Sequence, residues 1–389
     1  MPTTQTRKYV LMLFCLCLGW HLSRGQQNRW FLNSRGSIVG LGEFTHGTAE
    51  SYHNRIKLID QYLAGSDSLV IAVEMPSHCT IPINRFLRGE CSYESVKASL
   101  LFFGLLTNEF KEAISAAREQ YKKGKYIFIF GMDVPYYKDN AVYLTNAVVN
   151  AGRCGHTRVT RRLSNMDLDA CLPGNRALYD SLKKEMYEME ACLNQEMSGP
   201  APRTEKEDIL YAVENIKQSI DYIYLSGTAN ANQSAIRDSM MADNVMHTYD
   251  SLRLTTMIWA HNFHISRGKD RLGFFLDKRY GKGYIPMMEQ SFEGSLLAKR
   301  ENVLGAWRFV NDRGIGKWLN RHFQKDTTLL FKDTAAHIFN KIDKKMWVHY
   351  VGAEVEDKAI LNYFYFNPAA YFDGIIYHQK STASTVLPR

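Results

Sequence analysis

Each of four short apolar runs in this chain ends in an acidic residue or a histidine. The side chains at or just after these ends are Glu43, His46, Glu74, Asp133, His261 and His264. Histidines and carboxylates gathered in one place support two kinds of chemistry. In the first, a histidine acts as general base on a water molecule while a carboxylate holds its tautomer. In the second, the same side chains bind a metal ion that activates the water.

Other catalytic groups have no signature in the sequence. The chain contains no Gly-x-Ser-x-Gly segment, which argues against a serine nucleophile on a strand-to-helix turn. No Gly-x-Gly-x-x-Gly follows an apolar run, which argues against a dinucleotide cofactor. The cysteines lack the spacing of a zinc site or the local pattern of a nucleophile. The histidines and carboxylates are therefore the groups on which a functional hypothesis can rest.

The apolar runs have to position these side chains, and their composition predicts strands of one sheet. The runs are residues 38–41, 69–73, 127–130 and 257–260. Strands that are apolar throughout are typical of parallel sheets covered on both faces, and the carboxyl ends of such strands share one edge. We predict an α/β fold with a mostly parallel sheet flanked by helices. Glu43, His46, Glu74 and His261 should converge on one cavity at that edge, with His46 opening the first helix.

Between the third and fourth strands the chain changes to long polar stretches with helical spacing. Residues 177–197, 205–226 and 234–252 have this pattern, and a Pro- and Gly-rich break separates the first two. We interpret residues from about 140 to 250 as a helical insertion that caps the sheet and roofs the cavity. Elsewhere the spacing predicts further elements. These are helices at 99–121, 273–280 and 314–323 and strands at 284–288, 345–351 and 371–377.

The N-terminal segment has the features of a secretory signal. Arg7 and Lys8 precede an apolar stretch, residues 9–18, and small and polar residues follow it. We predict cleavage near Gly25, which leaves residues 26–389 as the mature domain, exported to the periplasm or the extracellular space. An uncleaved anchor is the alternative, although the stretch is short for a bilayer span. No other stretch is long and apolar enough, so stable membrane insertion after cleavage is not expected.

Length and composition are those of an ordinary globular protein. The chain has 389 residues, a length that suits one large α/β domain with insertions or two domains. Its net charge is +8, but no run of Lys and Arg is long enough to follow a phosphate backbone, so nucleic acid is not an expected partner. The oligomeric state and the pairing of the cysteines after the predicted signal stay open. Those cysteines are Cys79, Cys91, Cys154, Cys171 and Cys192.

Two segments resemble motifs of the erythromycin esterase family. Residues 40–50, GLGEFTHGTAE, resemble its Gly-x-x-Glu-x-x-His-Gly-[Thr/Ser]-x-Glu motif, and residues 259–264, WAHNFH, resemble its Trp-Ala-His-Asn-x-His motif. Between them, Arg55, Glu74 and Asp133 stand where the family has an arginine in the first helix, a glutamate after the second strand and a Gly-x-Asp. The matching blocks keep the family order over about residues 36–295.

The resemblance implies hydrolysis of a small-molecule ester or lactone, in the named members the lactone of macrolide antibiotics. It implies water activated by a histidine, with no required metal and no other cofactor. His46 would be the general base, with Glu43 and Glu74 to orient or polarise. His261 and Arg55 would bind substrate or stabilise the oxyanion. The residues that the resemblance places in substrate binding are Arg55, Asp133 and His264.

A second hypothesis assigns the same Glu/His crevice to a metal- or haem-binding protein, or to a metal-dependent hydrolase. Folds related to this family include haem-binding lipoproteins and metal-dependent peptidases, so the resemblance permits this function. The metal content of the purified protein distinguishes the two hypotheses. The substrate itself does not follow from the fold or from the site residues.

Overall fold

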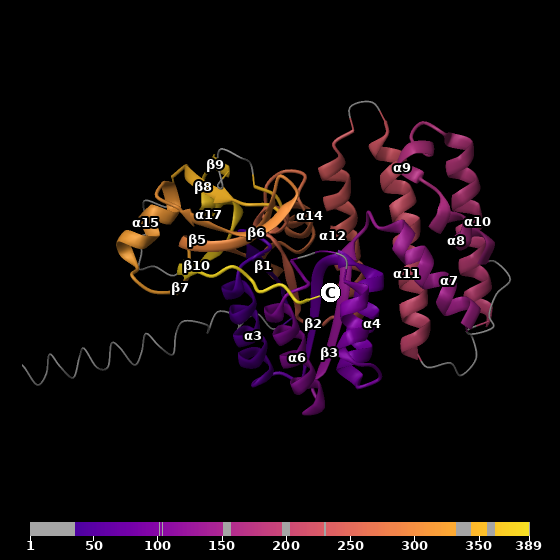
Figure 1. The fold of residues 1–389 in the computed structure, drawn as a ribbon, viewed down its shortest axis with the longest axis horizontal. Helices are drawn as coiled ribbons and strands as arrows, with labels where there is room; N and C mark the ends of the chain where they lie inside the picture. Colours follow the sequence, from indigo (N-terminus) through magenta and orange to yellow (C-terminus); the bar gives the residue numbers. More distant parts are fainter. Residues whose placement is uncertain are drawn as a thin grey trace, which may run out of the picture.

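The computed structural model describes residues 36–100, 102, 104–150, 157–196, 203–228, 231–331, 344–355 and 362–388. The predicted signal, residues 1–25, and Cys154 lie outside the described residues. Figure 1 shows a twisted sheet with helices on both faces and a group of long helices at one side. The predicted α/β fold, a mostly parallel sheet flanked by helices, is confirmed.

The main sheet has eight strands in the order β3-β2-β4-β1-β5-β10-β7, and β6 pairs with β5 outside this path. The four strands expected to be neighbours are neighbours and run parallel, as predicted. They are β1 (Ile38–Glu43), β2 (Ser68–Pro76), β3 (Tyr126–Asp133) and β4 (Thr256–His261). The other strands are β5 (Tyr284–Arg300), β6 (Val303–Val310), β7 (Thr327–Leu330) and β10 (Gly374–Ser381).

Both faces of the parallel strands are buried, which explains why their sequences are apolar without alternation. Along β2, Leu69, Ile71 and Val73 face one core, and Val70 and Ala72 face another. The first core includes side chains of α3 (Ala49–Leu63), α4 (Ser77–Arg88), α5 (Tyr93–Ser99) and α6 (Asn108–Lys122). The second includes side chains of α12 (Gln233–Leu252), α13 (Asn262–Ile265), α14 (Leu272–Tyr280) and α15 (Gly314–His322).

The helical segment between β3 and β4 divides into two parts. Five helices share a core of their own, which includes Leu144, Met186 and Ile216. They are α7 (Tyr137–Asn150), α8 (Thr157–Asn165), α9 (Leu168–Cys171), α10 (Arg176–Glu196) and α11 (Arg203–Ser226). Figure 1 shows α7, α8, α10 and α11 beside the sheet, with α12 between them and the strands. Thus α12 packs into the sheet core, and α11 reaches the same core with Tyr211.

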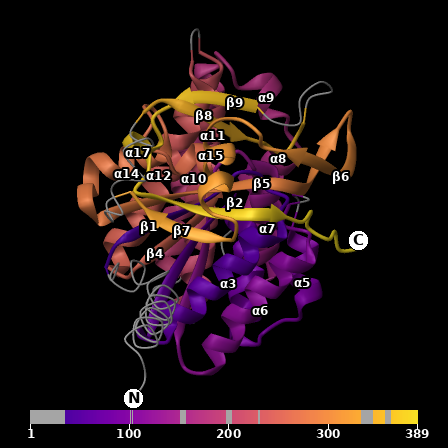
Figure 2. The same cartoon turned by 90° about the vertical axis from the view of Figure 1, so that its left-hand side faces the viewer.

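Several predicted boundaries differ from those observed. β5 continues past residue 288 to Arg300 because it pairs there with the antiparallel strand β6. The strand expected at 371–377 begins only at Gly374, since α17 (Pro368–Tyr371) comes first, capped by Asn367. The strand expected at 345–351 is β8 (Met346–Tyr350), which pairs with β9 (Asn362–Phe366) in a separate two-stranded sheet. Figure 2 shows this pair apart from the main sheet.

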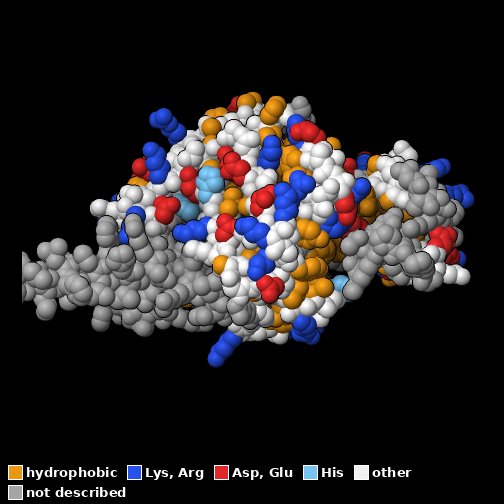
Figure 3. All heavy atoms as spheres, turned by 90° about the horizontal axis from the view of Figure 1, so that it is seen from below, with side chains coloured by type: hydrophobic (Ala, Val, Ile, Leu, Met, Phe, Trp, Pro, Cys, Tyr) orange, Lys and Arg blue, Asp and Glu red, His pale blue; other side chains and the backbone are white. Residues whose placement is uncertain are grey.

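The surface carries mixed charges. Figure 3 shows Lys and Arg side chains interspersed with Asp and Glu on the face seen from below. Among the residues that the structure describes, no helix has the length and apolar character needed to cross a bilayer.

Candidate active site

The carboxyl ends of β1, β2 and β4 bring the predicted polar residues together. Glu43 is the last residue of β1 and lies directly opposite His261, the last residue of β4. Glu74 is on the neighbouring strand β2, near its carboxyl end. His46 lies in the turn after β1 and not in the first helix, which begins at Ala49, so the expectation that His46 opens this helix is wrong. The turn keeps its imidazole beside the ends of the strands.

Glu43 joins a histidine and an arginine. Its Oε1 lies 2.5 Å from His46 Nδ1, and its Oε2 lies 2.9 Å from an Arg55 amino nitrogen. Burial opposes ionisation of Glu43, but the charge of Arg55 and the hydrogen bond from His46 lower its pKa. Arg55 is itself buried, 5.2 Å from the ring centres of both Tyr52 and Trp259. The carboxylate is therefore ionised and fixed on both oxygens.

His46 has one nitrogen engaged with Glu43. When Nδ1–H donates to that carboxylate, Nε2 is left as an acceptor. Burial lowers the pKa of His46, but the hydrogen bond and the charge of Glu43 raise it above its ordinary value of 6.5. The imidazole is thus a stronger base than a free histidine, held in one tautomer by a buried carboxylate.

His261 is a neutral imidazole facing His46. The two ring centres are 5.5 Å apart. Its Nε2 lies 3.2 Å from the Phe44 carbonyl, to which it donates, and its Nδ1 accepts from the Phe263 amide at 3.4 Å. Burial, with the charge of His46, lowers the pKa of His261 to about 4. Both ring nitrogens are engaged, so His261 shapes the site in its neutral form.

Glu74 is bonded on both carboxylate oxygens. Its Oε2 accepts from the His261 amide at 3.0 Å, and its Oε1 lies 3.2 Å from His264 Nε2 and 3.0 Å from an Arg237 amino nitrogen. Burial opposes ionisation, but the charges of His264, His46 and Arg237 hold the pKa of Glu74 well below its ordinary value. Glu74 is therefore a fixed negative charge that ties the end of β4 to β2.

His264 and Asp133 are buried and belong to the same cluster, since His264 contacts Glu74 and Arg237 links Glu74 with Asp133. His264 lies between two carboxylates, with Nδ1 2.6 Å from Asp238 Oδ1. Burial lowers its pKa, but the charges of Glu74 and Asp238 raise it to about 9. Asp133 accepts two hydrogen bonds from Arg237, at 2.8 and 2.7 Å. Neither side chain has a free polar edge toward a substrate.

Arg237 and Asp238 were missed by the sequence analysis. They come from α12, more than a hundred residues after β3 in the chain, and no motif marks them. The one available signal was an Arg-Asp pair inside a helix otherwise predicted to pack as a roof. These two side chains contact Glu74, Asp133 and His264, but none of the described residues of the 140–250 segment lines the small cavity beside His46, so the expected roof is not found over it.

A small cavity of about 20 Å³ lies between Glu43, His46, Arg55 and Glu74. Its other walls are Tyr52, Val73, Phe102, Leu105 and Trp259, and Phe102 meets the His46 ring edge-on. His261 was expected to converge on this cavity, but it lies beside the His46 ring and does not line the cavity. This volume holds one water molecule, which needs roughly 10–15 Å³, and the walls offer it polar partners. Across the described residues, no three His, Cys, Asp or Glu side chains are grouped so as to hold a metal ion. The arrangement can hold a water beside a histidine base.

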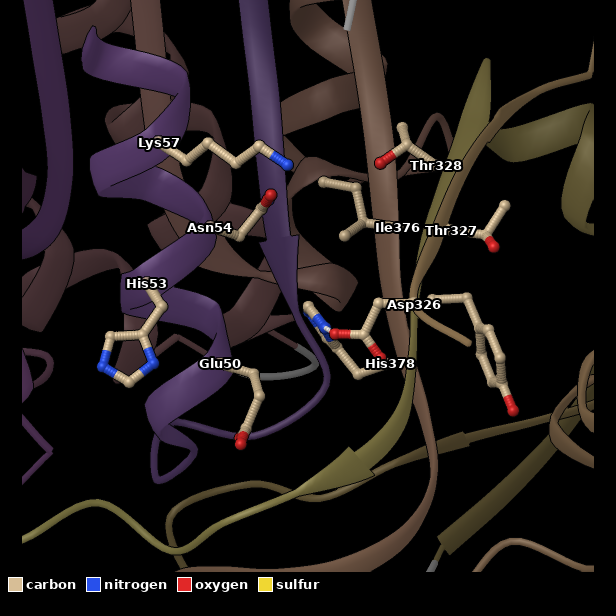
Figure 4. A pocket seen from close by; sticks show the side chains of 10 residues that line it. Glu50, His53, Asn54, Lys57, Asp326, Thr327, Thr328, Ile376 and His378 are labelled. Atoms are coloured by element: carbon tan, nitrogen blue, oxygen red, sulfur yellow. Dashed lines mark hydrogen bonds and ion pairs between the residues drawn. The ribbon is translucent and has the colours of Figure 1, made fainter. Parts of the chain in front are cut away.

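A second cavity, of about 250 Å³, lies on the opposite side of α3 (Figure 4). Glu50, His53, Asn54 and Lys57 line it from the helix, facing the segment 326–328 and strand β10. It shares none of its walls with the cavity beside His46. The histidine of α3, His53, is therefore not part of the cluster.

The sequence matches the family model described as "Erythromycin esterase" over residues 70–381. The match covers most of the chain and includes Glu74, Asp133, His261 and His264. The chain belongs to the erythromycin esterase family. Membership supports a hydrolase. The segment with Glu43 and His46 precedes the matched residues, and the parallel pairing of β1 with β4 joins it to them.

Three solved structures share the fold. A succinoglycan biosynthesis protein has a TM-score of 0.78 and 17% identity, over 93% of this chain and 92% of its own. A protein from Bacillus cereus has a TM-score of 0.74 and 16% identity, over 93% of each chain. A mutant of the erythromycin esterase EreC in its open conformation has a TM-score of 0.64 and 14% identity, over 89% of this chain and 91% of its own. No curated protein sequence matches the chain.

Proposed function

We propose that this member of the erythromycin esterase family hydrolyses a small-molecule ester or lactone with a water molecule activated by His46. One observation carries the proposal. The buried Glu43 holds His46 Nδ1 at 2.5 Å on one oxygen and Arg55 on the other, beside a cavity that fits one water. A base held in one tautomer by a carboxylate, next to a water site, is the arrangement that general-base hydrolysis requires.

The steps follow from the positions of these groups. His46 Nε2 takes a proton from the water as its oxygen attacks the carbonyl carbon, and Glu43 stabilises the imidazolium that forms. Arg55 lines the cavity and offers positive charge to the oxyanion of the tetrahedral intermediate. His46 then returns the proton to the departing alkoxide. The products are an alcohol and a carboxylic acid, which ionises by releasing the second proton of the water to solvent; the two remain one molecule when the substrate is a lactone.

The other residues of the cluster are assigned supporting roles. Glu74 and His261 fix the strand ends and keep a neutral imidazole opposite the base. Asp133 and His264 act behind Glu74 and do not touch substrate, which revises the role implied by resemblance. The carboxylates and histidines are bonded to one another and to Arg55 and Arg237, so we assign the reaction no metal. The name erythromycin esterase makes a macrolide lactone one candidate substrate.

The proposal extends to location. The basic, apolar and small-residue segments before residue 26 lead us to assign export to the periplasm or extracellular space, after cleavage near Gly25. N-terminal sequencing of protein from the native host checks this. A mature chain that starts at Met1 contradicts it.

The activity is tested with residues 26–389 against a panel of esters and lactones, macrolides included, with and without a chelator. We expect hydrolysis of at least one member at the same rate with chelator present, lost in His46→Ala and retained in His53→Ala. The control changes an exposed histidine of α3 outside the cluster. Activity that chelator abolishes and a divalent ion restores would favour the metal-dependent alternative. Hydrolysis of no panel member would contradict the esterase assignment.

A further inference from the structure

Two consecutive residues of α12, Arg237 and Asp238, reach the polar cluster from outside the strands that define it. We propose that they are positioning residues of the active site. Arg237 holds Glu74 directly, and Asp238 holds it through His264. Together they keep Glu74 in the orientation that fixes His261 opposite His46. This inference rests on the proposed hydrolysis. It assigns part of the site to a helix that carries none of the family motifs.

The contact from Asp238 is a buried ion pair with His264. Asp238 is fully buried, with Oδ1 2.6 Å from His264 Nδ1 and Oδ2 3.5 Å from an Arg271 amino nitrogen. A buried carboxylate is costly unless a cation compensates it. His264 supplies that charge, and its other nitrogen reaches Glu74 at 3.2 Å. Asp238 thus sets which way the His264 ring presents a proton to Glu74.

The contact from Arg237 separates two carboxylates. Its guanidinium donates to both oxygens of Asp133, at 2.8 and 2.7 Å, and to Glu74 at 3.0 Å. A planar guanidinium with fixed donors imposes direction as well as charge. Without it, the negative charges of Glu74 and Asp133 would face each other with no cation between them. Glu74 would then turn away from Asp133.

The orientation of Glu74 matters because its other oxygen holds the His261 amide at 3.0 Å. That bond fixes the last residue of β4, whose ring centre lies 5.5 Å from that of His46. The path from α12 to the base therefore has three contacts: Arg237 or His264 to Glu74, Glu74 to His261, and His261 to His46. A displacement of about 1 Å along such a path costs roughly a hundredfold in rate.

The first test compares Asp238→Asn with Asp243→Asn. Asp243 is an exposed residue of the same helix and provides a matched control. We expect Asp238→Asn to lower kcat about ten- to a hundredfold with KM within threefold, because positioning acts on the transition state and not on binding. Asp243→Asn should keep the wild-type kcat. Equal kcat in wild type and Asp238→Asn overturns the proposal.

The second test follows His264 by NMR in substrate-free protein. The charged and titratable groups that face this imidazole are Glu74 from β2, Arg237 and Asp238 from α12, and the rings of His46 and His261. We expect the wild-type ring to stay protonated to about pH 9 and to lose its proton at lower pH in Asp238→Asn. The kcat of that variant should fall over the same pH range. An unchanged His264 titration overturns the role of Asp238.

Arg237 provides a separate test if Asp238→Asn fails to fold. Arg237→Lys keeps the positive charge but loses the bidentate hydrogen bonding to Asp133, and Arg237→Gln loses both. We expect kcat to fall in the order wild type, Lys, Gln, and the His261 amide to exchange faster with solvent in the same order. Wild-type kcat and amide exchange in Arg237→Gln overturn the proposal. The His264 titration and the His261 amide exchange need no substrate, so they test the positioning roles of Arg237 and Asp238 independently of activity. The proposed function, in contrast, is contradicted if no ester is hydrolysed.

Discussion

His46 has one nitrogen committed to Glu43 and one available for water, and this asymmetry defines the first prediction. His46→Ala should lower kcat by about a hundred- to ten-thousandfold, the range of general-base catalysis, with KM little changed. Steady-state kinetics on a hydrolysed ester measures this, and circular dichroism checks the fold. A variant that keeps the wild-type kcat would move the role of base to His261.

The Glu43–His46 pair also predicts a pH dependence. The base must be neutral, and Glu43 raises the pKa of His46 above 6.5, so kcat should rise with pH and reach half its maximum above pH 6.5. In Glu43→Gln the pair loses its charge, so the midpoint should move to lower pH while the maximal kcat falls. Profiles of kcat against pH for both proteins measure this. A midpoint shared by the two would show that Glu43 does not act on the base.

Among the individual residues, the sequence predicted those site residues that lie at the carboxyl ends of parallel strands. Glu43, Glu74 and His261 were expected together because carboxyl ends of parallel strands meet, and they do. The protonation of His264 was not predictable, since it depends on Asp238 from a helix with no local motif. Which nitrogen of His261 carries the proton likewise depends on a carbonyl, that of Phe44, whose position only the folded turn defines.

Among the elements, α13 is joined to β5 by the side-chain amide of Asn262, besides the contact of His264 with Glu74 on β2. The Asn262 side chain bonds both the amide and the carbonyl of Glu289 on β5, at 2.9 and 2.7 Å, and so spans the end of β1 at Gly42. A Cβ at position 42 would overlap the Asn262 amide oxygen. The absence of a side chain at Gly42 therefore leaves room for the Asn262 amide, which links the end of β4 to β5 across β1.

Gly42→Ala should consequently destabilise the protein by about 1–3 kcal/mol, the usual cost of overpacking a core. It should also lower kcat, because Asn262 follows His261 directly. Urea denaturation compares the variant with Gly352→Ala, where a Cβ meets no atom within 4 Å. Equal stability of the two variants would show that the β4–β5 link relaxes without cost.

Strand β10 contributes a buried histidine whose charge stabilises the fold. His378 lies between Asp326 at 3.1 Å and Glu289 at 3.6 Å. Burial lowers its pKa, but the hydrogen bonds and charges of these two carboxylates raise it to about 10. Because protonation is stronger in the folded state, the stabilisation is complete below about pH 6.5 and is lost as pH rises through 10.

His378→Gln should therefore be less stable than wild type at pH 6, and the difference should shrink toward pH 10. Urea denaturation at several pH values measures the free energy of unfolding. His247→Gln, an exposed position on α12, is the control and should track wild type throughout. A stability difference that does not depend on pH would mean that His378 acts through packing and not through its charge.

For the whole molecule, the sequence was informative where burial on both faces made strands apolar throughout. Strands β1 to β4 were predicted as neighbouring, mostly parallel strands of one sheet for this reason, and they are. Strand β7 was not, because it is only partly buried, and β9, with Phe364 and Tyr365 exposed, lies in a separate sheet. The packing of α12 against the strands was also beyond the sequence, since its periodicity matches that of the neighbouring helices.

The tail after β10 lies across the turn that holds His46. The Ala49 amide donates to the Thr382 carbonyl at 2.9 Å, and the Ser384 amide donates to the Gly47 carbonyl at 3.0 Å. Further along, the Leu387 amide donates to Leu106 at 2.8 Å. These bonds connect the turn that carries His46 with the loop before α6.

Removal of residues 382–389 should lower kcat by about tenfold or more while the main sheet persists, since the turn loses backbone partners and the base loses its fixed position. Kinetics and thermal unfolding of the truncated protein measure both effects. As a control, a short Gly-Ser extension after residue 389 keeps these bonds and should leave kcat unchanged. Full activity in the truncated protein would show that the turn holds His46 without the tail.

The same tail sets an order of events during synthesis. Glu50 and Thr382, joined by a hydrogen bond, are 332 positions apart, so the turn with His46 gains its last partners only when nearly all of the chain has emerged from the ribosome. Contacts of such separation form slowly, and earlier parts of a chain generally fold first. Here the first functional motif to be translated is among the last to be completed. Full hydrolytic activity should thus arise only after residue 384 has joined the fold, however early the sheet around the turn begins to form.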